Sequence, residues 1–243
     1  MNKPIVSVVI PAYNEATYID RLLEALAKQN YKNFEIIVSD AQSKDGTEEV
    51  VKKFVDILDI KFVESPPKGP GHGRNVGAKH AKGEWLLFLD ADDDIDDEDF
   101  IDTLLKETEN RGWNTSSAKM KTRNGPSYAT LYYYQRLLAH TKRPVASGYC
   151  IFTKRNIFEK SGGFNERIKF GEDYEYVSRT AKSGFGFVKS TYYYVDTRRN
   201  KSEGFGLTWR GTLNEFYRLL HGYKKLEKQP IKYEFGKHPK RKK

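Results

Sequence analysis

The segment Trp85-Leu86-Leu87-Phe88-Leu89-Asp90-Ala91-Asp92-Asp93 joins five apolar residues directly to a group of carboxylates. A buried strand of a parallel sheet reads as a short, continuous apolar run, because helices cover both of its faces. Ligands of such sheets bind just beyond the carboxyl ends of the strands. We therefore predict that Asp90 and Asp92 lie at a ligand site, where carboxylates can hold a divalent cation against a phosphorylated ligand.

Strand and helix patterns alternate through the first hundred residues. Apolar runs predict strands over 5–10, 34–38, 60–63 and 84–89, with the first one stopped by Pro11. A helical pattern begins at Glu15, and a turn and helix cap over 43–48 lead into a second helix that continues through Val50 to Val55. A loop and helix rich in small residues follow over 71–81. This alternation predicts an α/β fold, with a mostly parallel central sheet flanked by helices.

The pattern is looser after residue 100. We predict helices over 100–111, 128–140, 154–161 and 172–183, and strands over 117–121 and 147–152. A last helix with a broad apolar face is predicted over 205–223. It can pack against the domain, or it can lie on a membrane or a partner chain.

Bulk properties restrict the class of protein. The chain has 243 residues, enough for one domain with a full core. Its longest apolar runs are far shorter than the ~18 residues that a membrane-spanning helix needs. A strand-like run begins almost at the N-terminus, so we expect no secretory signal. The single cysteine, Cys150, allows no internal disulfide and fits a reducing cytoplasm.

The positive charge is concentrated at the C-terminus. The net charge is +9, but residues 224–243 hold nine Lys or Arg against two Glu, so the other residues carry only +2. A nearly neutral body argues against a nucleic-acid partner. The tail over 224–243 is therefore either a solvated terminus or a segment attracted to an anionic membrane surface.

Several familiar site patterns are absent. The glycines of 69–77 match neither G-x-G-x-x-G nor the P-loop spacing, which leaves a loop of small residues that brings Arg74 and backbone N–H groups near a phosphate. The acidic run over 90–99 lacks the glycine and the glutamate of a calcium loop. Histidine spacing does not fit a zinc site, and no serine has a G-x-S-x-G setting.

Five segments of the chain carry a combined signal: residues 8–15, 36–47, 71–77, 88–93, and 163–166 with 172–173. In this order they resemble the family 2 glycosyltransferases, which have the GT-A nucleotide-sugar-binding fold and invert the anomeric centre. Together they extend over roughly residues 5 to 185. The family commonly has Asp-Asp-Gly-Ser or Asp-Gly-Gly-Ser where this chain has Asp40-Ala41-Gln42-Ser43. The Gln-x-x-Arg-Trp motif and the membrane helices of processive members are missing, which disfavours synthesis of long polymers.

The resemblance implies roles for individual residues. Asp40 would accept a hydrogen bond from the base, as an acid facing a uracil N–H can, and Arg74 would lie by the nucleotide and its phosphates. Asp92 would hold Mg²⁺ or Mn²⁺, with Asp90 towards the ribose or the metal waters. Asp173 would be the catalytic base, with Glu172 as its neighbour. The full set implied for the nucleotide sugar is Pro11, Ala12, Tyr13, Glu15, Asp40, Gly71, Arg74, Asp90 and Ala91.

The resemblance also implies how the chain is organised. Residues 1–223 would form one catalytic domain, with a nucleotide-sugar half over 1–100, an acceptor half over 101–200 and the helix over 205–223. Aromatic residues of the second half, Tyr128 to Tyr134, Trp113 and Tyr149, suit either a sugar or lipid acceptor or a core. Asp45 is expected to cap the following helix rather than to contact ligand.

We therefore expect a metal-dependent inverting glycosyltransferase of the hexosyltransferase type. Its donor would be a nucleoside-diphosphate sugar, with a UDP-sugar favoured, and its acceptor a saccharide or a lipid-linked molecule. We expect it in the cytoplasm, with the basic tail able to contact the inner face of the membrane. Two alternatives are a nucleotidyltransferase that makes sugar nucleotides and a non-catalytic transferase-like assembly protein. A nucleotidyltransferase would have a glycine-rich basic loop after the first strand, where this chain has Pro11 to Glu15.

Overall fold

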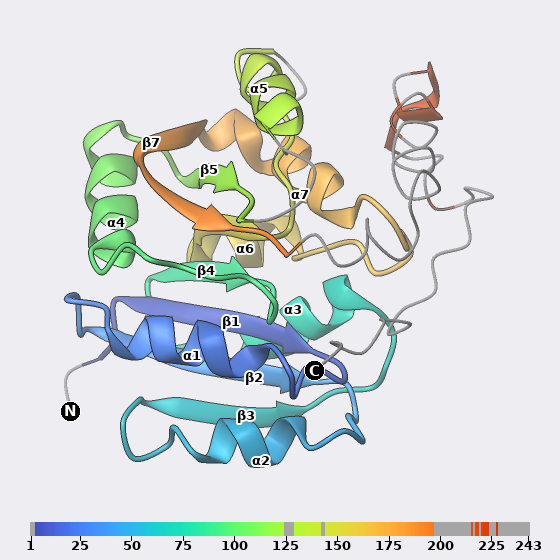
Figure 1. Ribbon diagram of the computed structural model, residues 1–243. Helices are drawn as coiled ribbons and strands as arrows, with labels where there is room; N and C mark the ends of the chain where they lie inside the picture. Colours follow the sequence, from blue (N-terminus) through green and yellow to red (C-terminus); the bar gives the residue numbers. More distant parts are fainter. Residues whose placement is uncertain are drawn as a thin grey trace.

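The computed structural model describes residues 3–123, 129–141 and 144–196, together with residues 215, 217, 218, 220–223 and 227. Its centre is a seven-stranded sheet with the order β3-β2-β1-β4-β6-β5-β7 (Figure 1). Helices cover both faces of this sheet, so the predicted α/β fold is confirmed. The strands are β1 Val6–Ala12, β2 Phe34–Asp40, β3 Ile60–Glu64, β4 Trp85–Leu89, β5 Thr115–Lys121, β6 Cys150–Lys154 and β7 Phe185–Tyr194. The helices are α1 Ile19–Ala27, α2 Thr47–Lys52, α3 Pro70–His80, α4 Phe100–Asn110, α5 Ala129–Leu138, α6 Arg155–Ser161 and α7 Glu172–Thr180, and the short 3₁₀ helix η1 Ala181–Ser183 follows α7.

The directions of the strands create one functional edge. β1 pairs in parallel with β2 and β4, and β2 pairs in parallel with β3. β6 runs antiparallel to both β4 and β5, and β5 pairs in parallel with β7. The carboxyl ends of every strand except β6 therefore meet at one edge, which we call the carboxyl edge. The segment that precedes β6 arrives at the same edge.

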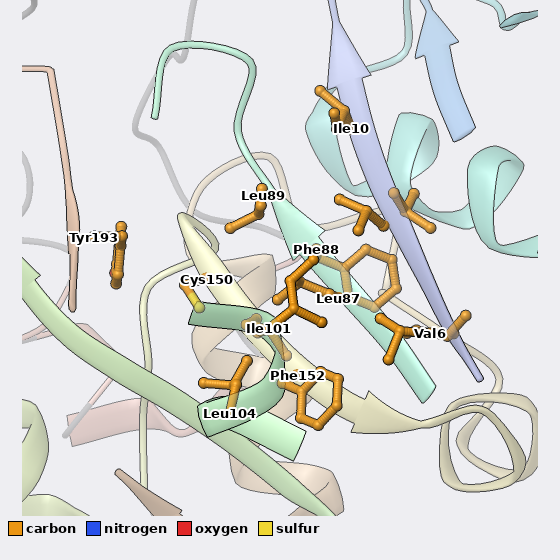
Figure 2. Close-up of a cluster of buried hydrophobic side chains, with 14 of the residues drawn as sticks. Val6, Ile10, Leu87, Phe88, Leu89, Ile101, Leu104, Cys150, Phe152 and Tyr193 are labelled. Atoms are coloured by element: carbon orange, nitrogen blue, oxygen red, sulfur yellow. The ribbon is translucent and has the colours of Figure 1, made fainter. Parts of the chain in front are cut away.

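The apolar run of β4 is buried on both faces. On one face, Leu87 lies with Cys150 and Phe152 of β6 and with Ile101 and Leu104 of α4 (Figure 2). The ring of Phe152 stacks on Trp85 with its centroid 4.7 Å away.

The opposite face of β4 packs on the segment before α7. Phe88 meets Phe164 edge to face, with ring centroids 5.1 Å apart. Because neither face of β4 contacts water, the strand has no polar residue until Asp90, at the carboxyl edge.

Glycines allow α3 to lie directly on the sheet. A Cβ atom on Gly77 would lie 2.5 Å from Cγ1 of Val9 in β1, and one on Gly73 would lie 3.1 Å from Cβ of Pro11. The predicted loop over the first part of 71–81 is wrong, because the helix begins at Pro70, a residue favoured in the first turn. The glycines serve close packing, and this packing brings Arg74 into the interior.

Other element predictions need correction. β1 continues through Pro11 to Ala12 instead of stopping before the proline, and β6 occupies Cys150–Lys154 instead of 147–152. β7 was not predicted, although it is the longest strand described. Its register with β5 shifts between Ser117 and Lys119, which marks an irregularity in the pairing.

Two predicted segments lie outside the described residues, apart from the single positions given above. These are the helix over 205–223 and the basic tail over 224–243. Among the helices that the structure describes, none combines the length and the apolar character needed to cross a bilayer.

Candidate functional site

Hydrogen bonds join the loops that follow β1 and β2 at the carboxyl edge. The Asn14 N–H donates to Ser43 Oγ at 2.7 Å, and the Lys44 N–H donates to Asn14 Oδ1 at 2.9 Å. The Glu15 N–H donates to Thr47 Oγ1 at 3.0 Å. Asn14 has a φ of 57°, a left-handed conformation that asparagine tolerates better than most residues. The predicted nucleotide residues Tyr13 and Glu15 therefore belong to a cross-linked pair of loops, directly after Ala12, the last residue of β1.

Asp40, the last residue of β2, is buried and oriented by its own loop. The Ser43 N–H donates to Asp40 Oδ2 at 2.8 Å, and the Ser43 hydroxyl donates to Asp40 Oδ1 at 2.5 Å. Each carboxylate oxygen keeps further capacity to accept a hydrogen bond. Asp45 accepts the Thr47 N–H at 3.1 Å, at the first residue of α2, but the N-cap position that the prediction gave to Asp45 is occupied by Gly46.

A tight turn follows β4 and contains the predicted metal residues. The Asp93 N–H donates to the Asp90 carbonyl at 3.0 Å, and the Asp90 N–H donates to Asp93 Oδ2 at 2.9 Å. Asp93 is fully buried, whereas Asp92 is half-buried. Oδ1 of Asp93 has no hydrogen-bond partner in the described part of the chain. Burial, followed by the charges of Asp90 and Asp92, raises the pKa of Asp93 well above its usual range.

Arg74 of α3 lies at the centre of the site. Its Nη2 donates to Asp90 Oδ1 at 2.7 Å, and its Nη1 donates to Glu172 Oε1 at 2.9 Å. Nη2 also donates to the carbonyl of Gly148 at 3.3 Å. The Arg74 side chain is only 3% exposed. One buried guanidinium thus links α3, the turn after β4, the start of α7 and the segment before β6.

The charges of this cluster are interdependent. Burial disfavours the charged form of Arg74, but the carboxylates of Asp90, Glu172 and Asp173 outweigh it and raise the pKa of the guanidinium. Burial raises the pKa of Glu172, while the Arg74 charge opposes this rise. A buried charge is tolerated here because opposite charges are hydrogen-bonded to it.

Asp173 is the second residue of α7 and has two backbone partners. The Gly148 N–H donates to Asp173 Oδ2 at 2.6 Å, and the Tyr174 N–H donates to Asp173 Oδ1 at 2.8 Å. Burial and then the neighbouring charge of Glu172 raise the pKa of Asp173 to about 7, although Arg74 and the two N–H groups oppose the rise. A carboxyl group of this pKa can accept a proton near neutral pH.

The donor set fits a divalent cation. Within the described residues, no three His, Cys, Asp or Glu side chains are grouped so that they could hold a metal ion by themselves. Magnesium, however, commonly uses one or two carboxylates and completes its shell with water and substrate phosphates. Asp92 and Asp90 supply hard oxygen ligands of this kind, although Asp90 also pairs with Arg74. The turn therefore suits a cation that arrives with a phosphorylated ligand.

The structure brings the predicted residues together in two groups. One consists of Gly71, Arg74, Asp90, Glu172 and Asp173, since a Cβ on Gly71 would lie 3.1 Å from Cγ of Glu172. The other consists of the loops after β1 and β2. The packing of Gly73 against Pro11 and the backbone of β2 sets α3, and with it the first group, beside these loops.

Sequence reasoning missed three residues of the site. Gly148 contacts both Arg74 and Asp173, yet an isolated glycine before a strand gave no signal. The buried role of Asp93 could have been inferred from its place directly after the strand. For Asn14, whose backbone is left-handed, the sequence signal was only the general preference of asparagine for turns.

The predicted acceptor aromatics have mixed environments. Tyr132 is buried and meets Phe187 edge to face, so it belongs to the core. Tyr133 is 58% exposed, and Trp113 and Tyr149 are half-buried.

A family model described as "Glycosyl transferase family 2" matches residues 7–162 of the chain. TarS of Staphylococcus aureus, a poly(ribitol-phosphate) beta-N-acetylglucosaminyltransferase, is 40% identical over 123 residues, which cover 49% of this chain and 21% of TarS. The glycosyltransferase AglE of Haloferax volcanii is 29% identical over 196 residues, which cover 76% of this chain and 64% of AglE. The chain therefore spans less than two thirds of these relatives.

Solved structures share the fold. TarS residues 1–349 of S. aureus, in complex with UDP-GlcNAc, match with a TM-score of 0.68 and 25% identity over 88% of this chain and 65% of that one. The mannosyltransferase PcManGT of Pyrobaculum calidifontis, in complex with GDP-Man and Mn²⁺, matches with a TM-score of 0.73 over 95% of this chain and 66% of that one. At 22% identity the second likeness shows the fold alone.

Replacing Arg74 with lysine is expected to lower the free energy of unfolding by about 3 kcal/mol, because one ammonium group cannot replace a fork that pairs with both Asp90 and Glu172. Urea denaturation measures this change. Arg111→Lys, at an exposed helix end, is the matched control and should change stability by less than about 0.5 kcal/mol. Equal stability of the two variants would contradict the central role of Arg74.

Asp93→Asn is expected to raise the melting temperature at neutral pH. The pKa of Asp93 is higher in the folded than in the unfolded state, so stability falls as pH rises from the unfolded value through the folded value. Each unit of difference corresponds to about 1.4 kcal/mol. Asparagine cannot ionise and keeps an acceptor for the Asp90 N–H, so the gain should vanish near pH 4, roughly the pKa of an unfolded aspartate. Thermal unfolding across this range checks the effect, with the exposed Asp56→Asn as control. A melting temperature unchanged by Asp93→Asn at every pH would show that Asp93 is ionised in the fold.

Proposed function

The chain belongs to glycosyl transferase family 2 and has the GT-A fold, and from this premise we propose that it is a metal-dependent inverting transferase. It moves a sugar from a nucleoside-diphosphate sugar to an acceptor hydroxyl. The observation that carries the proposal is the Arg74 cluster, which joins the turn with Asp90 and Asp92 to the helix with Asp173. The carboxylates proposed to bind the donor and the carboxylate proposed to act as the base thus belong to one hydrogen-bonded cluster.

A UDP-sugar is the favoured donor. Asp40 is fixed at the end of β2 with spare acceptor capacity, as recognition of the uracil N–H requires. TarS, which is similar in sequence and fold, has been solved in complexes with UDP and with UDP-GlcNAc. The end of β1 with Pro11 and Ala12, the loop that continues to Glu15 and the packed start of α3 form the remaining walls of the nucleotide site.

Asp173 activates the acceptor. As the acceptor oxygen forms a bond to the anomeric carbon, its proton passes to the Asp173 carboxylate, and the bond from that carbon to the diphosphate breaks. The diphosphate leaves with the bonding electron pair, on the face opposite to attack, so the configuration inverts. The N–H groups of Gly148 and Tyr174 fix the plane of the carboxylate and leave a lone pair on each oxygen for the proton.

Developing negative charge on the diphosphate must be stabilised. When bound, Mg²⁺ or Mn²⁺ held by Asp92, with Asp90 beside it, supplies positive charge at the departing group. The hydrogen bond from Arg74 to Asp90 orients the Asp90 carboxylate before the donor arrives. Rigid support of this kind lowers the reorganisation needed during reaction.

The alternatives give different outcomes in the tests that follow. A nucleotidyltransferase would release diphosphate from a nucleoside triphosphate and a sugar phosphate. A transferase-like assembly protein would bind no donor at all. The structured turn through Asn14, without a glycine-rich basic loop after β1, favours transfer over nucleotidyl chemistry.

Asp92→Ala is expected to abolish metal-dependent donor binding. For the wild type, a nucleotide at 100 times its Kd should stabilise the fold by about 2.7 kcal/mol, because it binds only the native state. Thermal unfolding with UDP, GDP, CMP and dTDP, each with and without Mn²⁺, measures this gain and identifies the base. Asp56→Ala, a distant exposed carboxylate, should behave as wild type. If Asp92→Ala retains the full Mn²⁺-dependent gain, Asp92 is not the metal ligand.

Asp173→Asn is expected to lower kcat by about 10²–10⁴-fold while donor binding is retained, because an amide cannot accept the proton. In the wild type only the ionised carboxylate acts, so kcat should rise with pH below about 7 and level off above it. Initial rates of transfer against pH, with donor affinity as the internal control, provide the check. A wild-type rate that is independent of pH on both sides of 7 would remove Asp173 as the base.

A further inference from the structure

β5 ends at the carboxyl edge with two half-buried lysines, Lys119 and Lys121. Alternate residues of a strand share a face, so the two lysines lie on one face of the strand, and the buried Met120 between them lies on the other.

Two tyrosines of β7 complete this face. Tyr192 pairs with Lys119, and Tyr194 pairs with Lys121. The two rings meet edge to face with centroids 5.5 Å apart, and both residues are half-buried. The ammonium of Lys121 lies 3.2 Å from the centroid of the Tyr192 ring. A cation over an aromatic face is held there by the ring quadrupole, so its position is set in advance.

These four residues, Lys119, Lys121, Tyr192 and Tyr194, form what we call the lysine–tyrosine patch. It adjoins the turn that would hold the metal. The Asp94 N–H donates to the Tyr194 carbonyl at 3.0 Å, and the Tyr194 N–H donates to the Asp94 carbonyl at 2.8 Å. Asp94 is only two residues beyond Asp92. The patch thus lies at the carboxyl edge, beside the donor motif.

The patch has positive charge that nearby acids do not cancel. Arg123, which lies over the ring of Tyr194, is paired with Asp94 and Asp96. Those two acids are therefore engaged. Among the residues that the structure describes, no carboxylate forms an ion pair with Lys119 or Lys121.

We infer that the lysine–tyrosine patch is an acceptor subsite for a saccharide or polyol that carries an anionic group, a phosphate or a carboxylate. The ammonium groups pair with the anion, and the tyrosine rings provide apolar edges beside the carbon skeleton. The inference rests on the proposed transferase function and adds to it the chemical class of the acceptor. Its position beside the metal turn suits an anion on an acceptor that approaches the bound donor.

The test compares charged and uncharged probes by equilibrium binding in the presence of UDP and Mn²⁺. The probe pairs are ribitol 5-phosphate with ribitol and glucuronate with glucose, so the two pairs separate a phosphate preference from a carboxylate preference. The wild type should bind at least one charged probe about fivefold more tightly than its uncharged partner, a ratio expected for one modest charge contact. The double variant Lys119→Gln/Lys121→Gln should lose this preference.

Two further variants make the result specific. Lys119→Arg/Lys121→Arg keeps the charge and should retain the preference, which also shows whether substitution at these positions disturbs the fold. Lys28→Gln/Lys79→Gln removes two exposed lysines from the C-terminal ends of α1 and α3, at the far edge of the sheet, and should behave as wild type. Failure of the wild type to bind either charged probe, or full preference in the Lys119→Gln/Lys121→Gln variant, overturns the inference.

Release of nucleotide from a panel of nucleoside-diphosphate sugars, UDP-GlcNAc among them, by the same wild-type preparation separates this inference from the proposed function. Donor hydrolysis without charge preference would remove the acceptor assignment alone. Charge preference without hydrolysis of any donor sugar would leave an anion site but remove the transferase proposal on which its role as an acceptor subsite rests.

Discussion

A guanidinium can be buried only where carboxylates meet it, and this requirement determines how four segments of the chain come together. Arg74 reaches the interior because Gly77 and Gly73 let α3 lie against β1. Once buried, its charge must be matched, and Asp90 and Glu172 do so from opposite sides. Burial and then the charge of Glu172 raise the pKa of Asp173 to about 7, and the charge of Arg74 opposes this rise. The packing of α3 therefore contributes to the acid–base character of the site.

Much of the fold could be predicted from the sequence, because buried parallel strands are short apolar runs. The runs ending at Leu89 and near Val38 gave β4 and β2 within two residues. β7 was missed although Phe185 to Tyr194 is rich in aromatic and β-branched residues. The polar pair Lys189-Ser190 interrupts its alternation where the register shifts, so no simple period of two is visible. The glycines of α3 indicated a loop because glycine has a low intrinsic helix propensity, which does not take into account the packing of the helix on the sheet.

The site was predictable to the extent that its chemistry is local. Asp90 and Asp92 follow from their place after a buried strand, since the carboxyl ends of such strands bind ligands. Glu172 and Asp173 had no such local signal, and only the resemblance to a family indicated them. The role of Gly148 depends on contacts with residues 74 and 25 positions away in the sequence, which no spacing rule contains. Roles that arise from three-dimensional neighbours require coordinates.

The reversed direction of β6 has a consequence for how this sheet recruits its functional groups. In a purely parallel sheet, one rim receives only the chain that leaves each strand. Here the chain that enters β6 reaches that rim as well, and it arrives with Gly148, whose N–H and C=O point to Asp173 and Arg74 respectively. The backbone of this one residue, which has no side chain, therefore bridges the carboxylate of Asp173 and the guanidinium of Arg74. This support depends on glycine itself, because a Cβ atom at residue 148 would lie 2.5 Å from Nη2 of Arg74, so any other residue type there would displace the guanidinium from its carboxylates.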